Sequence, residues 1–363
     1  MEKSARLGIN IGNTNTYVAT YRGTQLIPLV GRKHPDGVRT VFYDDNITKT
    51  VGVDALLAAE SEPVFLAEDI IDKLDKQVLL DTNEKQYSPK EVLTEIFKHV
   101  LGRAEAFLRY NMLFSFEDLE VVISVPDGIS AKHALLIKEA CEEVKTMLDR
   151  NVIVLDVIPA SVACAMGYAD NHDVANENLA VFDLGGTRFA ATIVRAGEDT
   201  SKPYTVEDRV VDDRLGGFDW DVCVENWLLG KYRAEINNKI TDFVQGRMKF
   251  EGPIVKEFLT NEDAASIEMD AKENNYKFEI TREEFENSSE EPKKRVADHF
   301  FPFIEKHADK NIKNLIVAGG STRMPQIRKM IEGSDKLGGM EIFFEGSDHL
   351  AARGAAVYAR DMK

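Results

Sequence analysis

The sequence has little cysteine and no long apolar run, and both scarcities limit what the protein can be. Its three cysteines, Cys141, Cys164 and Cys223, are widely spaced in apolar surroundings. Such cysteines are typical of buried reduced thiols, so we expect neither a disulfide nor a cysteine-ligated metal. The start of the chain lacks an apolar signal segment, and no apolar stretch is long enough to span a bilayer. We therefore expect a cytoplasmic protein with no membrane partner.

Positive charge is also in short supply. Lysine and arginine number 45 against 62 aspartate and glutamate residues, which gives a formal net charge of −17. Proteins that bind nucleic acid usually have the opposite balance, so we expect no nucleic-acid partner. The seven histidines form no His-Glu-x-x-His pattern and no close pair, which argues against a zinc site. An anionic ligand must therefore be held by local donors against the field of the whole molecule.

Two common nucleotide-binding motifs are missing, but three short glycine turns are present. The sequence contains neither Gly-x-x-x-x-Gly-Lys-Ser/Thr nor Gly-x-Gly-x-x-Gly after a strand, which excludes P-loop and Rossmann sites. The turns are Gly12-Asn13-Thr14, Gly185-Gly186-Thr187 and Gly319-Gly320-Ser321. Glycine lets backbone N–H groups approach a phosphate closely, and the third turn leads into an expected helix, whose N-terminal amides favour an anionic edge. The alternative at each position is a plain hairpin or strand–helix turn.

The apolar pattern predicts strands and helices in two similar halves. Strands are expected at 7–12, 16–21, 25–30, 119–125, 152–158 and 315–318. Helices are expected at 89–109 and 351–360, and three more are expected: one that begins at about 130, one that ends at 166 and one that begins at 325. Residues 181–187 repeat the pattern of residues 8–14: apolar, Asp or Asn, apolar, glycine, small residue, threonine. This repeat suggests an internal duplication, in which the first two glycine turns face each other across a cleft and grip a polyphosphate.

The order of several motifs resembles that of the nucleotide-binding half of DnaK-type seventy-kilodalton heat-shock chaperones. Besides the two phosphate turns, the motifs are Ser124-Val125-Pro126, Leu215-Gly216-Gly217-Phe218-Asp219, Ala265-Ser266-Ile267-Glu268 and Ile316 to Pro325. The match covers essentially the whole chain, and its most distinctive piece is the Gly-Gly-Ser-Thr-Arg turn. The resemblance implies an α/β, actin-like (ribonuclease H-like) fold, whose two duplicated lobes enclose ATP in a cleft.

The resemblance also divides the chain. A composition change near residues 170–178 sets lobe I at 1–173 and lobe II at 174–342, with a helical outer subdomain at about 216–290. Residues 343–363 resemble the family's helix that returns to lobe I. The segment at 68–88 is shorter than in the family, so we expect a trimmed outer subdomain there. Because the chain stops after the returning helix, we expect it to lack the family's linker and peptide-binding β-domain.

The resemblance further implies which residues bind ATP or ADP with Mg²⁺. Those near the phosphates are Gly12, Asn13, Thr14, Gly185, Gly186, Thr187, Gly216 and Gly217. Those near the adenosine are Gly319, Gly320, Ser321, Arg323 and Asp348, joined from the second lobe by Lys256 and Thr260. Asp183 keeps a carboxylate that holds magnesium through water in the family.

Several positions on which hydrolysis depends in the family have changed. The family has an aspartate in the first turn, a lysine that positions the attacking water, a glutamate before the proline that matches Pro159, and an aspartate after the second turn. The residues at these four positions here are, in the same order, Asn10, Glu68, Ile158 and Ala190. A carboxylate about 4 Å from a phosphate charge costs roughly 4 kcal/mol at an effective dielectric constant near 20. Lys73 or Arg188 is the candidate replacement for the lost positive charge. Glu257 replaces an arginine that stacks on adenine, which weakens binding.

These changes lead to the hypothesis of a divergent chaperone-type ATP-binding module with weak or absent hydrolysis. Such a module acts in protein folding or through chaperone and co-chaperone partners. One alternative is an active chaperone ATPase whose lost groups are replaced in space by others. Further alternatives are a scaffold that no longer binds nucleotide and an actin-like filament protein, against which the family-specific turns argue.

Overall fold

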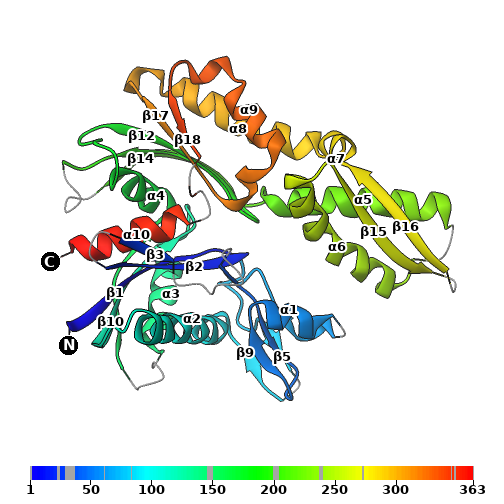
Figure 1. Ribbon diagram of the computed structural model, residues 1–363, viewed down its shortest axis with the longest axis horizontal. Helices are drawn as coiled ribbons and strands as arrows, with labels where there is room; N and C mark the ends of the chain where they lie inside the picture. Colours follow the sequence, from blue (N-terminus) through cyan, green and yellow to red (C-terminus); the bar gives the residue numbers. More distant parts are fainter. Residues whose placement is uncertain are drawn as a thin grey trace.

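The computed structural model contains one large sheet in each half of the molecule (Figure 1). It describes residues 2–22, 25–28, 37–60, 62–82, 84–144, 150–198, 204–236, 240–271, 274–344, 346 and 349–362. The first sheet consists of β1 (Glu2–Ile11), β2 (Asn15–Arg22), β3 (Gln25–Pro28), β4 (Val38–Arg39), β10 (Phe116–Val125) and β11 (Val152–Pro159). The second consists of β12 (Asn178–Leu184), β13 (Phe189–Arg195), β14 (Thr205–Asp212), β17 (Asn314–Ala318) and β18 (Glu341–Phe343).

The two sheets share one topology. In the first, the order β11-β10-β1-β2-β3 has β10 and β11 parallel to β1, while β2 and β3 follow as antiparallel hairpins. In the second, β18, β17, β12, β13 and β14 repeat this order and these directions. Because Asn10 pairs with Tyr17 as Asp183 pairs with Ala190, both stand at the same place in their hairpins. The predicted duplication and its alignment are therefore confirmed, and the fold is the actin-like two-lobe α/β fold.

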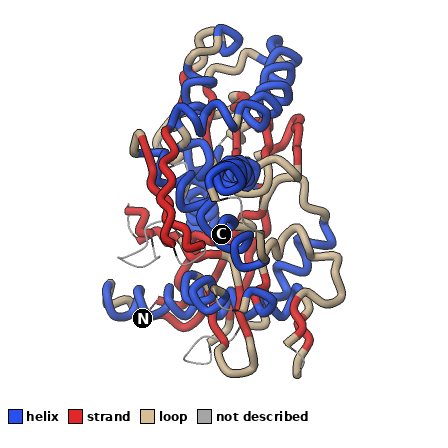
Figure 2. Tube along the Cα trace, turned by 90° about the vertical axis from the view of Figure 1, so that its right-hand side faces the viewer, coloured by secondary structure: helices blue, strands red, loops and turns tan. Residues whose placement is uncertain are grey.

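Two helices lie between the sheets, and their small residues explain how closely they pack. These helices are α4 (Ala160–Ala169) and α10 (Leu350–Asp361), which Figure 1 shows next to each other. The backbone of Gly354 lies against the carbonyl oxygen of Ala163, and Gly8 of β1 lies against the α10 backbone near Ala356. Only glycine permits such approach, because a Cβ atom would overlap the neighbouring backbone. In Figure 2 the C-terminal end lies mid-height in the molecule and the N-terminus lies in its lower part.

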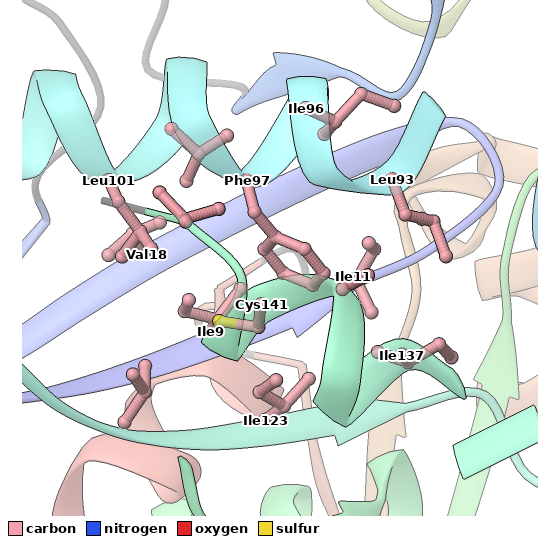
Figure 3. Packing of buried hydrophobic residues seen from close by; sticks show 14 of the residues in the cluster. Ile9, Ile11, Val18, Leu93, Ile96, Phe97, Leu101, Ile123, Ile137 and Cys141 are labelled. Atoms are coloured by element: carbon pink, nitrogen blue, oxygen red, sulfur yellow. The ribbon is translucent and has the colours of Figure 1, made fainter. Parts of the chain in front are cut away.

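The first half has its own apolar core between its sheet and two helices. Helix α2 (Pro89–Ala106) begins as the sequence predicts, with Ser88 and Glu91 forming a capping box and proline in the first turn. It packs with α3 (Ala131–Glu142) over the sheet. Figure 3 shows Phe97 and Leu93 of α2 pointing toward Ile11 of β1. Near the end of α2 the chain continues in a π-helical turn, η2 (Phe107–Asn111).

The second half has a separate core and a larger outer part. Phe182 and Phe300 meet edge to face beneath the sheet, and Trp220 is fully buried in the same cluster. The helices of this half are α5 (Gly217–Glu235), α6 (Asp242–Asn261), α7 (Arg282–Ser288), α8 (Glu290–Lys306) and α9 (Pro325–Glu332). Short 3₁₀ turns are η3 (Ala308–Lys310), η4 (Gly320–Arg323) and η5 (Asp335–Leu337).

The interpretation of residues 216–290 as helical was incomplete, because a β-hairpin lies among the helices. Strands β15 (Ala264–Ala271) and β16 (Asn274–Thr281) pair antiparallel next to α5 and α6 (Figure 1). The signal was an alternation of period two, with Ala265, Ile267 and Met269 all buried. The lobe boundaries given above remain predictions.

The outer part of the first half is built from short elements. These are β5 (Phe42–Asp44), β6 (Lys49–Val51), α1 (Val53–Ala59), η1 (Pro63–Phe65), β7 (Leu66–Ala67), β8 (Leu80–Asp81) and β9 (Gln86–Tyr87). All three cysteines are free thiols; Cys141 and Cys164 are buried as expected, whereas Cys223 is only partly buried. Across the described ranges, no helix combines the length and apolar character that crossing a membrane requires.

Candidate functional site

The first two glycine turns are equivalent hairpin loops that touch each other. Gly12 N donates to Asn15 O (3.1 Å), and Gly185 N donates to Arg188 O (2.9 Å), so each loop has two residues at its tip. The backbone of Gly186 lies against the Thr14 hydroxyl, where a Cβ atom would overlap that side chain. The structure therefore brings the two turns face to face between the halves, as their sequence repeat predicts.

The second turn is joined to the start of α5 and to the third glycine turn. Gly217 N donates to Gly185 O (2.9 Å), and Phe218 N donates to Gly186 O (2.7 Å). Ser321 Oγ also donates to Gly185 O (2.9 Å). Gly216 lies directly against Gly186, at a distance that only glycine allows. These bonds hold three glycine-containing segments of the second half in one cluster.

Lys256 joins this cluster from helix α6. Its Nζ donates to Gly217 O (3.0 Å) and forms an ion pair with Asp221 Oδ1 (2.7 Å). Asp221 is nearly buried, and this burial raises the pKa of its carboxyl despite the lysine beside it. The Thr260 hydroxyl donates to Lys256 O (3.1 Å), one helical turn back. The sequence interpretation did not single out Asp221, although its place four residues after Gly217 puts it on the same helix face.

The remaining residues that the family resemblance assigns to the adenosine are less closely tied to the cluster. Gly319 has a φ of 88° and lies against Leu184 O and the Asp183 carboxylate, so a side chain there would be strained and would overlap both. Gly320 O accepts from Arg323 Nε (3.3 Å), and Arg323 is exposed. Asp348 lies outside the described residues.

Two carboxylates lie near each other beneath the turns. Burial and the charge of Asp127 raise the pKa of Asp183 to about 7. Asp127 itself is 2% exposed and accepts from Ser161 N (2.9 Å) and Ser161 Oγ (2.6 Å); burial raises its pKa. Asn10, the counterpart of Asp183, instead accepts from Ser124 Oγ (3.0 Å). The sequence interpretation missed Asp127, although it directly follows the motif that ends at Pro126.

The other altered positions contribute little polar chemistry to the site. Ile158 is buried and pairs with Ser124 in the sheet, and Ala190 is buried opposite Asp183. Glu68 is exposed, and its carbonyl oxygen accepts from Lys73 Nζ (2.9 Å). Lys73 also pairs with Asp69 (3.2 Å), which holds its charge within its own segment.

Arg188, by contrast, reaches from the second half to the first. Its Nη1 donates to Asp127 O (2.9 Å), and its Nη2 pairs with Asp72 Oδ1 (2.9 Å). The second Asp72 oxygen accepts from Thr187 Oγ1 (3.1 Å) and from Asn13 Nδ2, which also donates to Thr187 Oγ1 (2.8 Å). We call this cluster of Asn13, Asp72, Thr187 and Arg188 the interlobe network.

A second polar contact between the halves lies farther out. Arg39 Nη2 of β4 pairs with Glu257 Oε1 of α6 (3.2 Å), and the glutamate side chain is 57% exposed. An exposed ion pair of this kind contributes about 1 kcal/mol or less, since water and salt screen it. Glu257 therefore has an interlobe partner at the position where the family resemblance implies an adenine-stacking arginine.

Comparison with known proteins gives several relatives that share about a quarter of their residues with this chain. "Chaperone protein DnaK" of Mesomycoplasma hyopneumoniae (strain 7448) is 27% identical over 350 residues, which is 92% of this chain and 54% of that protein. The protein of that name in Metamycoplasma hominis is 27% identical over 345 residues, 91% of this chain and 55% of its own length. The chain thus spans about half the length of the curated relatives it matches.

A family model agrees with these similarities and with the geometry. The model described as "Hsp70 protein" matches residues 45–360, which include the second and third glycine turns and the interlobe residues Asp72 and Arg188. The duplicated sheets, the facing turns and this match lead to one conclusion: the chain belongs to the Hsp70 protein family.

Proposed function

We propose that this chain is a chaperone-type nucleotide-binding module that binds ATP or ADP with Mg²⁺ and hydrolyses ATP slowly or not at all. The observation that carries the proposal is the contact between the two glycine turns, which come from equivalent places in the duplicated halves. Turns of this kind, facing each other, suit a polyphosphate held from both sides.

The residues around the turns fit a nucleotide. Gly186, Gly216 and Gly217 are packed so closely that a Cβ atom at any of them would overlap a neighbour, which keeps side chains out of the cradle. Lys256 and Ser321 stand beside Gly217 and offer polar groups toward the adenosine side. Bound Mg²⁺ would supply positive charge to the phosphates, and Asp183 would hold it through water.

Slow hydrolysis follows from the charges that surround the turns. Phosphoryl transfer depends on positioned cations and on a group that orients the attacking water. Asn10, Ile158 and Ala190 supply no charge, and the acidic Glu68 is exposed. Arg188 is the cation of the interlobe network, but its charge is paired with Asp72.

A second candidate function is an active ATPase with displaced groups, and Asp127 is the observation that favours it. This buried carboxylate follows β10 and binds the start of α4 through Ser161, close to Pro159. It is near enough to raise the pKa of Asp183, and Arg188 donates to its backbone. A carboxylate and a cation could thus return to the site from new positions in the sequence.

The proposal also includes a cellular role. The relatives carry the name of a chaperone, so we propose a part in protein folding in the cytoplasm, through nucleotide occupancy and contacts with chaperone or co-chaperone proteins. The contact between the lobes makes such a role physically reasonable, because a ligand that bridges two lobes changes their relative position.

The test is calorimetry of ATP and ADP binding with Mg²⁺, followed by phosphate release on the same sample. Gly217→Ala should lower ADP affinity by about tenfold or more, because its Cβ would overlap Ser321 Oγ. Gly230→Ala is the matched control in the same helix, with open space around its Cβ, and should leave affinity unchanged.

Each outcome separates the candidates. Tight binding without phosphate release supports the proposed module. Steady turnover supports the displaced-group ATPase instead. No binding of either nucleotide contradicts both, and leaves a scaffold with an inherited cleft.

A further inference from the structure

Asp72 lies on the turn that follows β7, and it brings a negative charge to the point where the two phosphate turns meet. Its Oδ1 pairs with Arg188, and its Oδ2 accepts from Thr187 and Asn13. The same segment is anchored to the first turn, because Asn13 Oδ1 accepts from Ile71 N (2.8 Å). The Asp72 side chain is 27% exposed, so the carboxylate is held by its partners rather than by deep burial.

The partners of this carboxylate are those that a phosphate group would use. Asn13 and Thr187 are tip residues of the two turns, and Arg188 follows the second tip directly. An arginine fork and neutral N–H and O–H donors bind carboxylate and phosphate oxygens alike. The planar carboxylate and the tetrahedral phosphate both carry negative charge on acceptor oxygens, so one can take the place of the other.

We propose that Asp72 stands in for the terminal phosphate of a nucleoside triphosphate and makes the cleft selective for a nucleoside diphosphate. This inference rests on the proposed nucleotide binding and adds the ligand class to it. A diphosphate leaves the interlobe network intact. A triphosphate places its last phosphate against Asp72, and must either displace the carboxylate or suffer like-charge repulsion.

The charges around the network also favour a diphosphate over a triphosphate. Among the described residues, the network contains one cation, Arg188, which Asp72 already neutralises. Asp127 and Asp183, other ionisable groups near the turns, supply no positive charge, and Lys73 is engaged by Asp69 and Glu68. A further phosphate therefore meets no surplus of positive charge there, and two anions placed so close together repel each other.

The experiment compares ATP and ADP affinity by calorimetry in the unaltered chain and in Asp72→Asn, with and without Mg²⁺. The unaltered chain should bind ADP more tightly than ATP. Asp72→Asn should raise ATP affinity relative to ADP affinity by about tenfold or more, since it removes the charge and keeps the side-chain shape. Asp72→Ser, which removes the carboxylate without adding an amide, should act in the same direction.

Asp75→Asn is the matched control. It removes the same charge from the same segment, but Asp75 pairs with Lys132 and His133, away from the turns. It should leave the ratio of ATP to ADP affinity unchanged. An equal shift in Asp75→Asn would mean that overall charge, and not the place of Asp72, sets the ratio.

Three further results would overturn the inference. An unchanged ratio in both Asp72 variants, with both nucleotides binding, would refute the selectivity and leave the proposed function standing. Weaker ATP binding by Asp72→Asn in Mg²⁺ would make Asp72 a partner of the metal instead. No binding of either nucleotide by any variant would refute both the inference and the function on which it rests.

Discussion

Asp183 keeps the carboxyl group that the family has at this position, but its surroundings disfavour the ionised form. Burial, and then the charge of Asp127, raise its pKa from an ordinary 3.8 to about 7. The folded chain therefore keeps a proton on this group at pH values where the unfolded chain has released it. Stability is lost as the pH rises from about 4 through about 7, and the full cost of ionising this carboxyl is present above that range.

Asp183→Asn should therefore stabilise the chain increasingly as the pH rises, in the absence of Mg²⁺ and nucleotide. We expect its free energy of unfolding, relative to the unaltered chain, to grow by about 1–3 kcal/mol between about pH 4.5 and pH 8. Urea unfolding at several pH values measures this difference. Asp118→Asn, on a strand where Asp118 accepts from Asn151 (3.3 Å), is the control for loss of one carboxylate. A difference that does not vary with pH would contradict the assignment.

At the scale of elements, helices α4 and α10 pack closely against each other between the two sheets. Gly354 meets Ala163 O, and Gly167 meets Leu350 O at 2.9 Å from its expected Cβ position. Alanines along α10, among them Ala351, Ala355 and Ala359, are buried in the same layer. Small residues here set the distance between the helices, and so the distance between the sheets that rest on them.

Gly354→Ala should destabilise the chain by about 2–3 kcal/mol, because the backbone that its Cβ would overlap cannot easily move away. Gly102→Ala in α2 is the matched control, since, apart from its chain neighbours and the nearby backbone of its own helix, nothing lies within 4 Å of its Cβ position. That control should be neutral or stabilise by up to about 1 kcal/mol, because alanine favours the helix over glycine. Denaturant midpoints of the two variants give the comparison, and equal midpoints would argue against the tight crossing.

At the scale of the whole molecule, the halves are joined by a shared apolar layer as well as by polar contacts. The layer contains Val122 from the first sheet, Val181 and Ile316 from the second, and the inner faces of α4 and α10. Moving the glycine turns apart would break the interlobe network, whereas separating the halves completely would expose this layer to water. The two halves should therefore unfold together.

Two probes can test this cooperativity. Trp220 and Trp227 lie on α5 and report the second half, and the buried thiol of Cys141 on α3 reports the first. In a chain that carries Cys164→Ala and Cys223→Ala, we expect tryptophan fluorescence and thiol labelling to give the same urea midpoint. Labelling of Cys141 at clearly lower urea would show that the first half unfolds independently.

Features that depend on neighbours along the chain could be predicted from the sequence. Apolar alternation and glycine position predicted the two equivalent hairpins, and Ser88 with Pro89 predicted the start of α2. The same alternation is present in the hairpin at 264–281. These patterns are readable because backbone hydrogen bonding and side-chain periodicity are local.

Which charges meet at the turns could not be predicted from the sequence, because the meeting depends on the folded arrangement. Asp72 and Arg188 are separated by 116 positions, and each lies in a segment with no local motif for the other. Of the two candidate cations, the structure brings Arg188 to the turns and keeps Lys73 with Asp69. Such meetings depend on how two folded halves are set against each other, and that placement leaves no periodic trace in the sequence.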